Sequence, residues 1–140
     1  GGPFTDYNEV LSYEKAVELQ LENASLAPER ANYLVANYGR QTPAIIEAAL
    51  KREEGTDVAR LAAAEAQWCI KNEFALYPMD FFERRSGRLY FDLPSIEPVL
   101  DEVLAVFAIA YDYSEAELEA EKERVYDAIT WVSEFNKVTT

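Results

Sequence analysis

Runs of apolar side chains at helical spacing, each bounded by helix start and stop signals, constrain this fold more than any other feature. Pro28 opens one such run and Gly39 ends it, and the apolar residues between them follow at i, i+3, i+4 and i+7: Ala31, Leu34, Val35 and Tyr38. Proline is favoured in the first turn of a helix, and glycine just after the last turn. The pattern therefore predicts a helix over residues 28–38.

The same signals recur along most of the chain. We expect helices over 13–24, 28–38, 42–54, 57–74, 78–86, 95–111 and 114–135, with residues 89–91 as an extended connection. No convincing stretch alternates apolar and polar residues as a half-buried strand does. The sequence thus predicts an all-α fold, a compact bundle of six or seven helices in a single domain. Residues 1–11 are expected to be a junction or linker and residues 12–140 the helical domain.

The charge of the chain excludes some classes of partner. Twenty-six acidic residues against 13 basic ones give a formal net charge of -13, which repels the phosphates of nucleic acids and of anionic lipids. No run approaches the roughly 20 apolar residues that a membrane-spanning helix needs. We therefore expect no nucleic-acid partner and no direct membrane insertion.

Missing residue types exclude several kinds of catalytic site. The chain has no histidine, so Ser-His-Asp and Cys-His catalysis and histidine-containing zinc sites are ruled out. It also lacks the glycine-rich loops that hold dinucleotides and nucleotides. The single cysteine, Cys69, lies on an apolar stripe and reads as a buried hydrophobe. No catalytic, cofactor-binding or metal-binding residue is predicted.

Charged side chains gather among large apolar ones in residues 65–86. Glu65 falls inside the apolar stripe of the 57–74 helix, where a carboxylate needs a partner. Glu73 lies about 12 Å further along that helix and about 80° around it. Asp80 and Arg84 have the i, i+4 spacing at which opposite charges meet, and Arg85 points to a neighbouring face. We expect a structural carboxylate–guanidinium cluster between two helices, with contact to another domain as the alternative.

Two further groups of residues are ambiguous or unremarkable. The aromatic side chains near this segment could form core or a docking patch, and the sequence does not separate the two uses: Tyr77, Phe81, Phe82, Tyr90 and Phe91. The glutamates that alternate from 115 to 123 spread around a helix, so we expect them to be solvated.

The segment from Glu73 to Ser86, followed by Leu89-Tyr90-Phe91, carries a family resemblance. It is similar to the Asp-Phe-Leu-x-Arg-Arg-Thr motif in the C-terminal domain of FAD-dependent glycerol-3-phosphate dehydrogenases and alpha-glycerophosphate oxidases. Residues 31–39, Tyr113-Ser114 and Gly1-Gly2 resemble other parts of that domain. Phe82 replaces the usual Leu, Ser86 the usual Thr, and Asn37 stands where the family usually has Arg.

The resemblance implies a flavoprotein oxidoreductase as the parent, one that converts glycerol 3-phosphate to dihydroxyacetone phosphate and passes electrons to quinone or oxygen. FAD would be bound by the missing N-terminal flavin domain of the same polypeptide and not by this chain, which would be a helical cap without activity of its own. Glu65, Glu73, Asp80, Arg84 and Arg85 are then motif residues with a structural or interdomain role.

The resemblance further implies a cytoplasmic protein. It is compatible with a parent peripheral to the cytoplasmic membrane and with a homodimer of the parent. The competing hypothesis is a free-standing acidic helical protein-interaction module. The two differ in a visible consequence, because a separated cap should expose an apolar patch near its ion cluster, whereas a self-sufficient module should be polar there.

Overall fold

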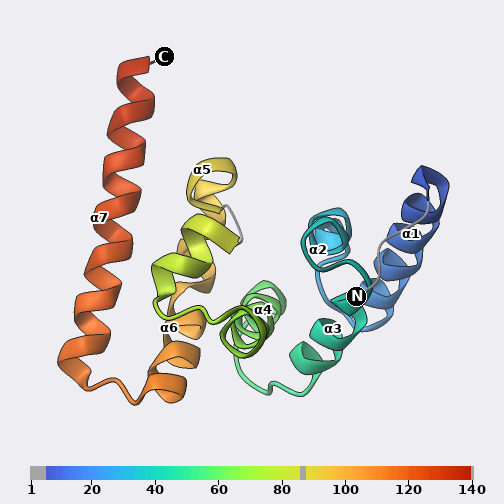
Figure 1. Cartoon of the computed structure of the whole chain (residues 1–140), viewed down its shortest axis with the longest axis horizontal. Helices are drawn as coiled ribbons and strands as arrows, with labels where there is room; N and C mark the ends of the chain where they lie inside the picture. The colour runs from blue at the N-terminus through green and yellow to red at the C-terminus, as the bar shows by residue number, and fades with distance from the viewer. Residues whose placement is uncertain (1–5, 86–87, 140) are drawn as a thin grey trace. The chain divides into compact units, whose positions relative to one another are not determined.

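The computed structural model describes residues 6–85 and 88–139, and within those ranges the chain is helical and has no strand (Figure 1). The predicted all-α class with six or seven helices is confirmed. The α-helices are α1 (Tyr7–Asn23), α2 (Ala31–Tyr38), α3 (Thr42–Leu50), α4 (Asp57–Glu73), α5 (Arg88–Phe91), α6 (Glu97–Tyr111) and α7 (Glu115–Thr139). Single turns of 3-10 helix span Pro28–Arg30, Gly39–Gln41 and Leu93–Ser95, and a π-helical segment spans Asp80–Arg85.

Contacts within the chain group it into two compact units, one ending at Ala64 and the other beginning at Glu65. The boundary falls inside α4, whose helical backbone continues through it. Each unit has apolar residues of its own that are buried.

In the first unit, α1 packs against α2 and α3 (Figure 1). Its buried side chains come from all three helices: Val17, Leu21, Leu34, Ile45 and Ile46. Gly39 ends α2 with a φ of 52°, a conformation that glycine adopts without steric cost. The hydroxyl of Thr42 donates to the carbonyls of Leu34 and Gly39, at 3.2 and 2.7 Å, so this tight corner is closed by a buried side chain.

The first helix starts earlier than the sequence predicts. Regular structure was expected near Ser12, but α1 begins at Tyr7. The side chain of Asp6 caps it by accepting a hydrogen bond of 2.8 Å from the backbone N–H of Glu9. Residues 7–11 are therefore helical, because Asp6 supplies an N-cap ahead of the predicted start.

In the second unit, α6 and α7 run antiparallel on either side of a short turn (Figure 1). Asp112 ends α6 in the left-handed conformation. A capping box opens α7 where the sequence predicts a helix start, because Ser114 and Glu117 exchange reciprocal side-chain to backbone hydrogen bonds of 3.1 Å. The core of this unit includes large, fully buried side chains: Phe81, Phe82, Ile96, Leu100 and Phe107.

Three local predictions are wrong. Residues 89–91 belong to the short helix α5 and are not extended. The helix predicted to begin at Ser95 begins at Glu97, and the hydroxyl of Ser95 donates to the carbonyl of Asp92 at 2.7 Å. Glu121, expected among the solvated glutamates, is only 7% exposed. In the case of Glu121 the neighbours of α7 include α5, which the local sequence does not reveal.

Candidate functional site

The buried carboxylate predicted on α4 has a basic partner, Arg88, which the helical spacing of residues 65–86 does not indicate. Glu65 is completely buried and Arg88 is 4% exposed. An Nη of Arg88 lies 3.3 Å from Oε2 of Glu65, and the other Nη donates to the carbonyl of Ser95 at 3.2 Å. Because α4 supplies the acid and α5 the base, the pair ties two elements of the second unit together. Removing one partner would leave a charge without compensation in the core.

Arg88 lies three residues beyond Arg85, outside the segment in which the sequence predicts the ion cluster. The signal was nevertheless present, since Arg88 directly precedes the apolar Leu89, which is itself buried. The guanidinium of Arg88 also lies 6.0 Å from the centre of the Phe81 ring, an arrangement that favours a cation beside an aromatic face.

Asp80 organises the loop that precedes it. Its Oδ2 accepts two hydrogen bonds of 3.0 Å, from the backbone N–H groups of Leu76 and Tyr77. Its own N–H donates to the carbonyl of Tyr77 at 2.9 Å. A carboxylate that accepts two backbone N–H bonds holds those residues in one conformation. Asp80 therefore fixes the position of the loop formed by residues 74–77.

The remaining predicted cluster residues are only partly visible. Glu73 is the last residue of α4 and is exposed to solvent. Arg84 and Arg85 end the π-helical segment, but their side chains lie outside the described part of the structure. The structure therefore places Glu65 and Asp80 in two different settings, one in the core with Arg88 and the other on the loop.

The loop fixed by Asp80 carries exposed aromatic and aliphatic side chains. Phe74 is 82% exposed, Leu76 54% and Tyr77 51%. Tyr111, at the end of α6, donates from its hydroxyl to the carbonyl of Ala75. We call the residues gathered here the aromatic loop surface: Phe74, Leu76, Tyr77, Tyr111 and Tyr113.

Tyr113 joins this surface from the turn between α6 and α7. Its hydroxyl donates to the carbonyl of Leu76 at 3.4 Å, and its ring stacks on that of Tyr111 with centroids 6.4 Å apart. Burial, and next the nearby carboxylate of Glu121, raise the pKa of Tyr113 to about 12. Desolvation disfavours the phenolate, so the hydroxyl remains a neutral donor at ordinary pH.

The structure distinguishes core from exposed positions for some of the aromatic residues whose use the sequence left open. Of the five aromatic residues proposed for core or docking, Phe81 and Phe82 are completely buried, with ring centroids 5.3 Å apart. Tyr77 is exposed, and the side chains of Tyr90 and Phe91 lie outside the described part. The exposed members that were missed, Phe74 and Tyr111, sit at helix ends, where periodicity gives no guide to exposure.

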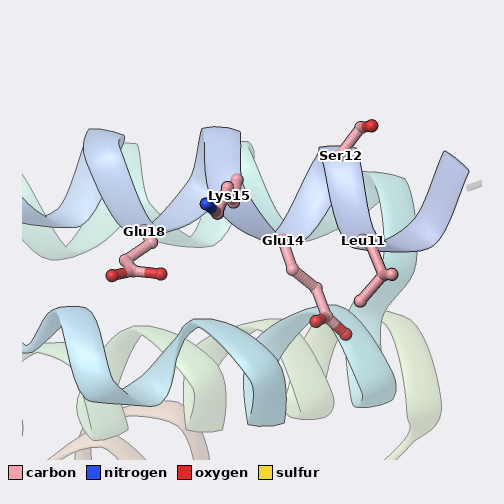
Figure 2. A pocket seen from close by; sticks show the side chains of 5 residues that line it. All are labelled: Leu11, Ser12, Glu14, Lys15 and Glu18. Atoms are coloured by element: carbon pink, nitrogen blue, oxygen red, sulfur yellow. The ribbon is translucent and has the colours of Figure 1, made fainter. Parts of the chain in front are cut away.

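A small hollow on α1 is a poor candidate for a ligand site. Its lining residues all come from one helix: Leu11, Ser12, Glu14, Lys15 and Glu18. Figure 2 shows the hydroxyl of Ser12 pointing away from the side on which Leu11 and Glu14 lie. Glu14 also accepts a hydrogen bond of 3.4 Å from the Asn32 side chain on α2. One helical wall with two carboxylates does not suit an anionic dinucleotide.

Other requirements of cofactor and metal chemistry are not met by the residues that the structure describes. Those residues include no group of three or more potential metal ligands. They also provide no strand followed by a glycine-rich turn, the arrangement that holds the pyrophosphate of FAD in dinucleotide-binding folds. We therefore assign no step of flavin chemistry to the described residues. None of the described helices is both long enough and apolar enough to span a membrane.

Comparison with known proteins identifies the family. Residues 6–118 match the family described as the C-terminal domain of alpha-glycerophosphate oxidase. The aerobic glycerol-3-phosphate dehydrogenase of Staphylococcus aureus strain USA300 is 38% identical over 65 residues, which are 46% of this chain and 12% of that protein. Its counterpart in the bovine strain RF122 is 37% identical, with the same coverage. Since the family match covers most of the chain, the protein belongs to the family of alpha-glycerophosphate oxidase C-terminal domains.

Proposed function

We propose that this chain is the C-terminal helical domain of an FAD-dependent glycerol-3-phosphate dehydrogenase or oxidase, which converts glycerol 3-phosphate to dihydroxyacetone phosphate. The observation that carries the proposal is the family match over residues 6–118. The matched relatives are named aerobic glycerol-3-phosphate dehydrogenases, and the matched segment spans only 12% of their length. The activity therefore belongs to the whole parent protein.

Within that parent, this domain packs on the N-terminal flavin domain of the same polypeptide and is not catalytic alone. FAD, bound by the flavin domain, accepts the hydride of the substrate. The residues of this chain supply structure: Glu65 holds α4 to α5 through Arg88, and Asp80 fixes an exposed loop. Glu73, Arg84 and Arg85 complete a motif with a structural or interdomain role.

The proposal extends to the setting of the parent. Electrons that leave a flavin need an acceptor, and quinone and oxygen are the two candidates. We propose a cytoplasmic parent that touches the cytoplasmic membrane peripherally through other parts of the polypeptide. A homodimer of the parent is a further proposal, and its mass in solution measured by light scattering would test it.

A free-standing acidic interaction module is less well supported. The chain is strongly acidic, with a net charge of -13, but its most exposed aromatic residues in the second unit include Phe74, on the loop that Asp80 fixes. An apolar surface beside the family motif is expected where another domain of the same protein once covered it. A self-sufficient acidic module would present polar side chains there.

Glycerol-3-phosphate-dependent dye reduction tests the proposed function. Three proteins should be compared: the full-length parent with FAD, the parent truncated before Gly1, and this chain alone. We expect activity in the parent and none in this chain, and the truncated protein shows whether the helical domain is needed. A parent that holds no flavin and does not oxidise glycerol 3-phosphate would refute the proposal and leave the interaction module as the better hypothesis.

A further inference from the structure

Phe74 occupies a conformation that does not suit its residue type. It directly follows α4 with a φ of 57°, in the left-handed region. Glycine, or sometimes Asn, usually takes the position after a helix, because a side chain with a Cβ costs about 1 kcal/mol or more there. Ser25 and Asp112 also have positive φ, but they are small or able to bond locally. A bulky phenylalanine at such a position is an outlier.

The ring of Phe74 gains little from the fold around it. The residue is 82% exposed, so burial within this chain does not offset the backbone strain. Strained residues of this kind persist where the surrounding structure fixes them, and they gather at binding sites. The exposed ring and the strained backbone together point to a contact made outside this chain.

The loop that presents Phe74 is held in place before any partner arrives. Asp80 accepts from two of its backbone N–H groups, and the hydroxyls of Tyr111 and Tyr113 donate to two of its carbonyls. Its conformation is therefore anchored from both α6 and the turn before α7. Such preorganisation reduces the entropy that is lost on binding.

We propose that the aromatic loop surface is the face by which this chain docks on the N-terminal flavin domain of its parent, an inference that rests on the proposed function. The matched segment is only 12% of the length of the relatives, so most of such a protein lies outside this chain and can cover this surface. The carboxylates of Glu117 and Glu121 act on Tyr113 at one side of it. The face of the flavin domain that meets this surface should accordingly be apolar at its centre, with basic side chains opposite these two carboxylates.

Hydroxyl-radical footprinting of the flavin-loaded parent, read by mass spectrometry, tests the docking face. Trp131 is an internal control, since it is 65% exposed and lies about 24 Å along α7 from Glu115. Relative to Trp131, labelling of Phe74 should fall roughly fivefold or more from the 140-residue chain to the parent, because interface cores exclude water. Circular dichroism first verifies that the 140-residue chain is helical.

The outcomes separate this inference from the proposed function. An active flavoprotein whose Phe74 is labelled as strongly as in the 140-residue chain would overturn the docking face and leave the function intact. A parent without flavin or activity would remove the proposed function, which dye reduction measures independently. Protection of Trp131 in place of Phe74 would move the docking face to α7 and overturn the inference as stated.

A pair of variants of the parent adds a test that does not depend on labelling. Phe74→Asn removes the ring and tolerates the left-handed backbone. Trp131→Asn is the matched control, because it removes another exposed ring, 65% accessible, far along α7. Protease release of the C-terminal domain from the Phe74→Asn parent should be roughly tenfold faster, as expected for loss of an aromatic contact in an interface. Equal release from both variants and the unaltered parent would contradict the proposal.

Discussion

Phe74 and the Phe81–Phe82 pair lie within nine residues of one another, yet they have opposite environments. Phe74 is 82% exposed, whereas Phe81 and Phe82 are completely buried. The first residue follows the end of α4 in a left-handed conformation, and the pair sits on the helical segment that follows Pro78. Residue type is the same, so the difference in burial comes from the position of each ring in the fold.

Asp80 stands between the two environments and connects them. Its carboxylate holds the loop of Phe74, and its backbone begins the π-helical segment that buries Phe81 and Phe82. The family motif around Asp80 therefore serves two tasks in a few residues. The residues after Asp80 include the buried Phe81 and Phe82, and the residues before it form an exposed loop. Substitutions on the two sides should separate stability from docking.

The largest effect is expected in the core half. Phe82→Ala should lower the free energy of unfolding of this chain by about 4 kcal/mol, because it leaves a cavity where a fully buried ring was packed. Urea denaturation followed by circular dichroism measures the change. A loss below about 1 kcal/mol would mean that the site collapses or that the ring is not packed as described.

Arg88→Ala should be the next most damaging substitution. It removes the guanidinium that pairs with the fully buried Glu65, and breaking a buried ion pair from one side costs about 3 kcal/mol or more. The double variant Glu65→Leu with Arg88→Met is the control, since replacing both charges by apolar groups should recover much of the loss. A double variant that is as unstable as Arg88→Ala would show that the charge left alone is not the cause.

Asp80→Ala should have a smaller effect on stability. It removes a side chain that accepts from two backbone N–H groups on an exposed loop, and losses of this kind typically cost about 1 kcal/mol. Thermal unfolding of this chain measures it, with Asp80→Asn as a control that keeps one acceptor oxygen. Amide hydrogen exchange at Leu76 and Tyr77 should quicken in Asp80→Ala, and unchanged exchange would contradict the role given to Asp80.

The sequence predicted the fold well because most of its signals are local. Helix starts at Pro28 and Ser114 and the stop at Gly39 act within one turn, so they can be read without knowing the neighbours. Some of the errors occur where a contact with another element overrides the local pattern, whereas the late start predicted for α1 concerns the local N-cap Asp6. Residues 89–91 become helical next to the buried Arg88, and Glu121 becomes buried on α7, whose neighbours include α5.

The candidate surface was less predictable for the same reason. The position of Glu65 on an apolar stripe correctly indicated that this carboxylate needs a partner. The sequence alone does not show that the partner is Arg88 and not Arg84 or Arg85, because this depends on the path of the chain after α4. Exposure of Phe74 and Tyr111 depends on helix ends, where apolar periodicity stops. The contact of Tyr111 with the carbonyl of Ala75 joins residues far apart in sequence, which spacing alone does not reveal.

Tyr113 gives the surface a modest dependence on pH. Its pKa is about 12 in the folded chain against an ordinary value of 10. The folded chain therefore holds the proton more tightly than the unfolded chain, and this stabilisation is complete below pH 10 and lost as the pH rises towards 12. Denaturant midpoints measured across that range should fall more for this chain than for Tyr113→Phe. Parallel declines would show that the hydroxyl of Tyr113 does not contribute.

The smallest change in stability is expected from Phe74→Asn. This variant gives the strongest contrast between Phe74 and the buried pair Phe81 and Phe82. The ring is 82% exposed and its φ is 57°, so its removal loses little burial and relieves strain of about 1 kcal/mol. The melting temperature of this chain should stay the same or rise slightly, whereas Phe82→Ala lowers it strongly. A marked loss of stability in Phe74→Asn would show that the ring packs within this chain, and the reason for assigning it to an external contact would disappear.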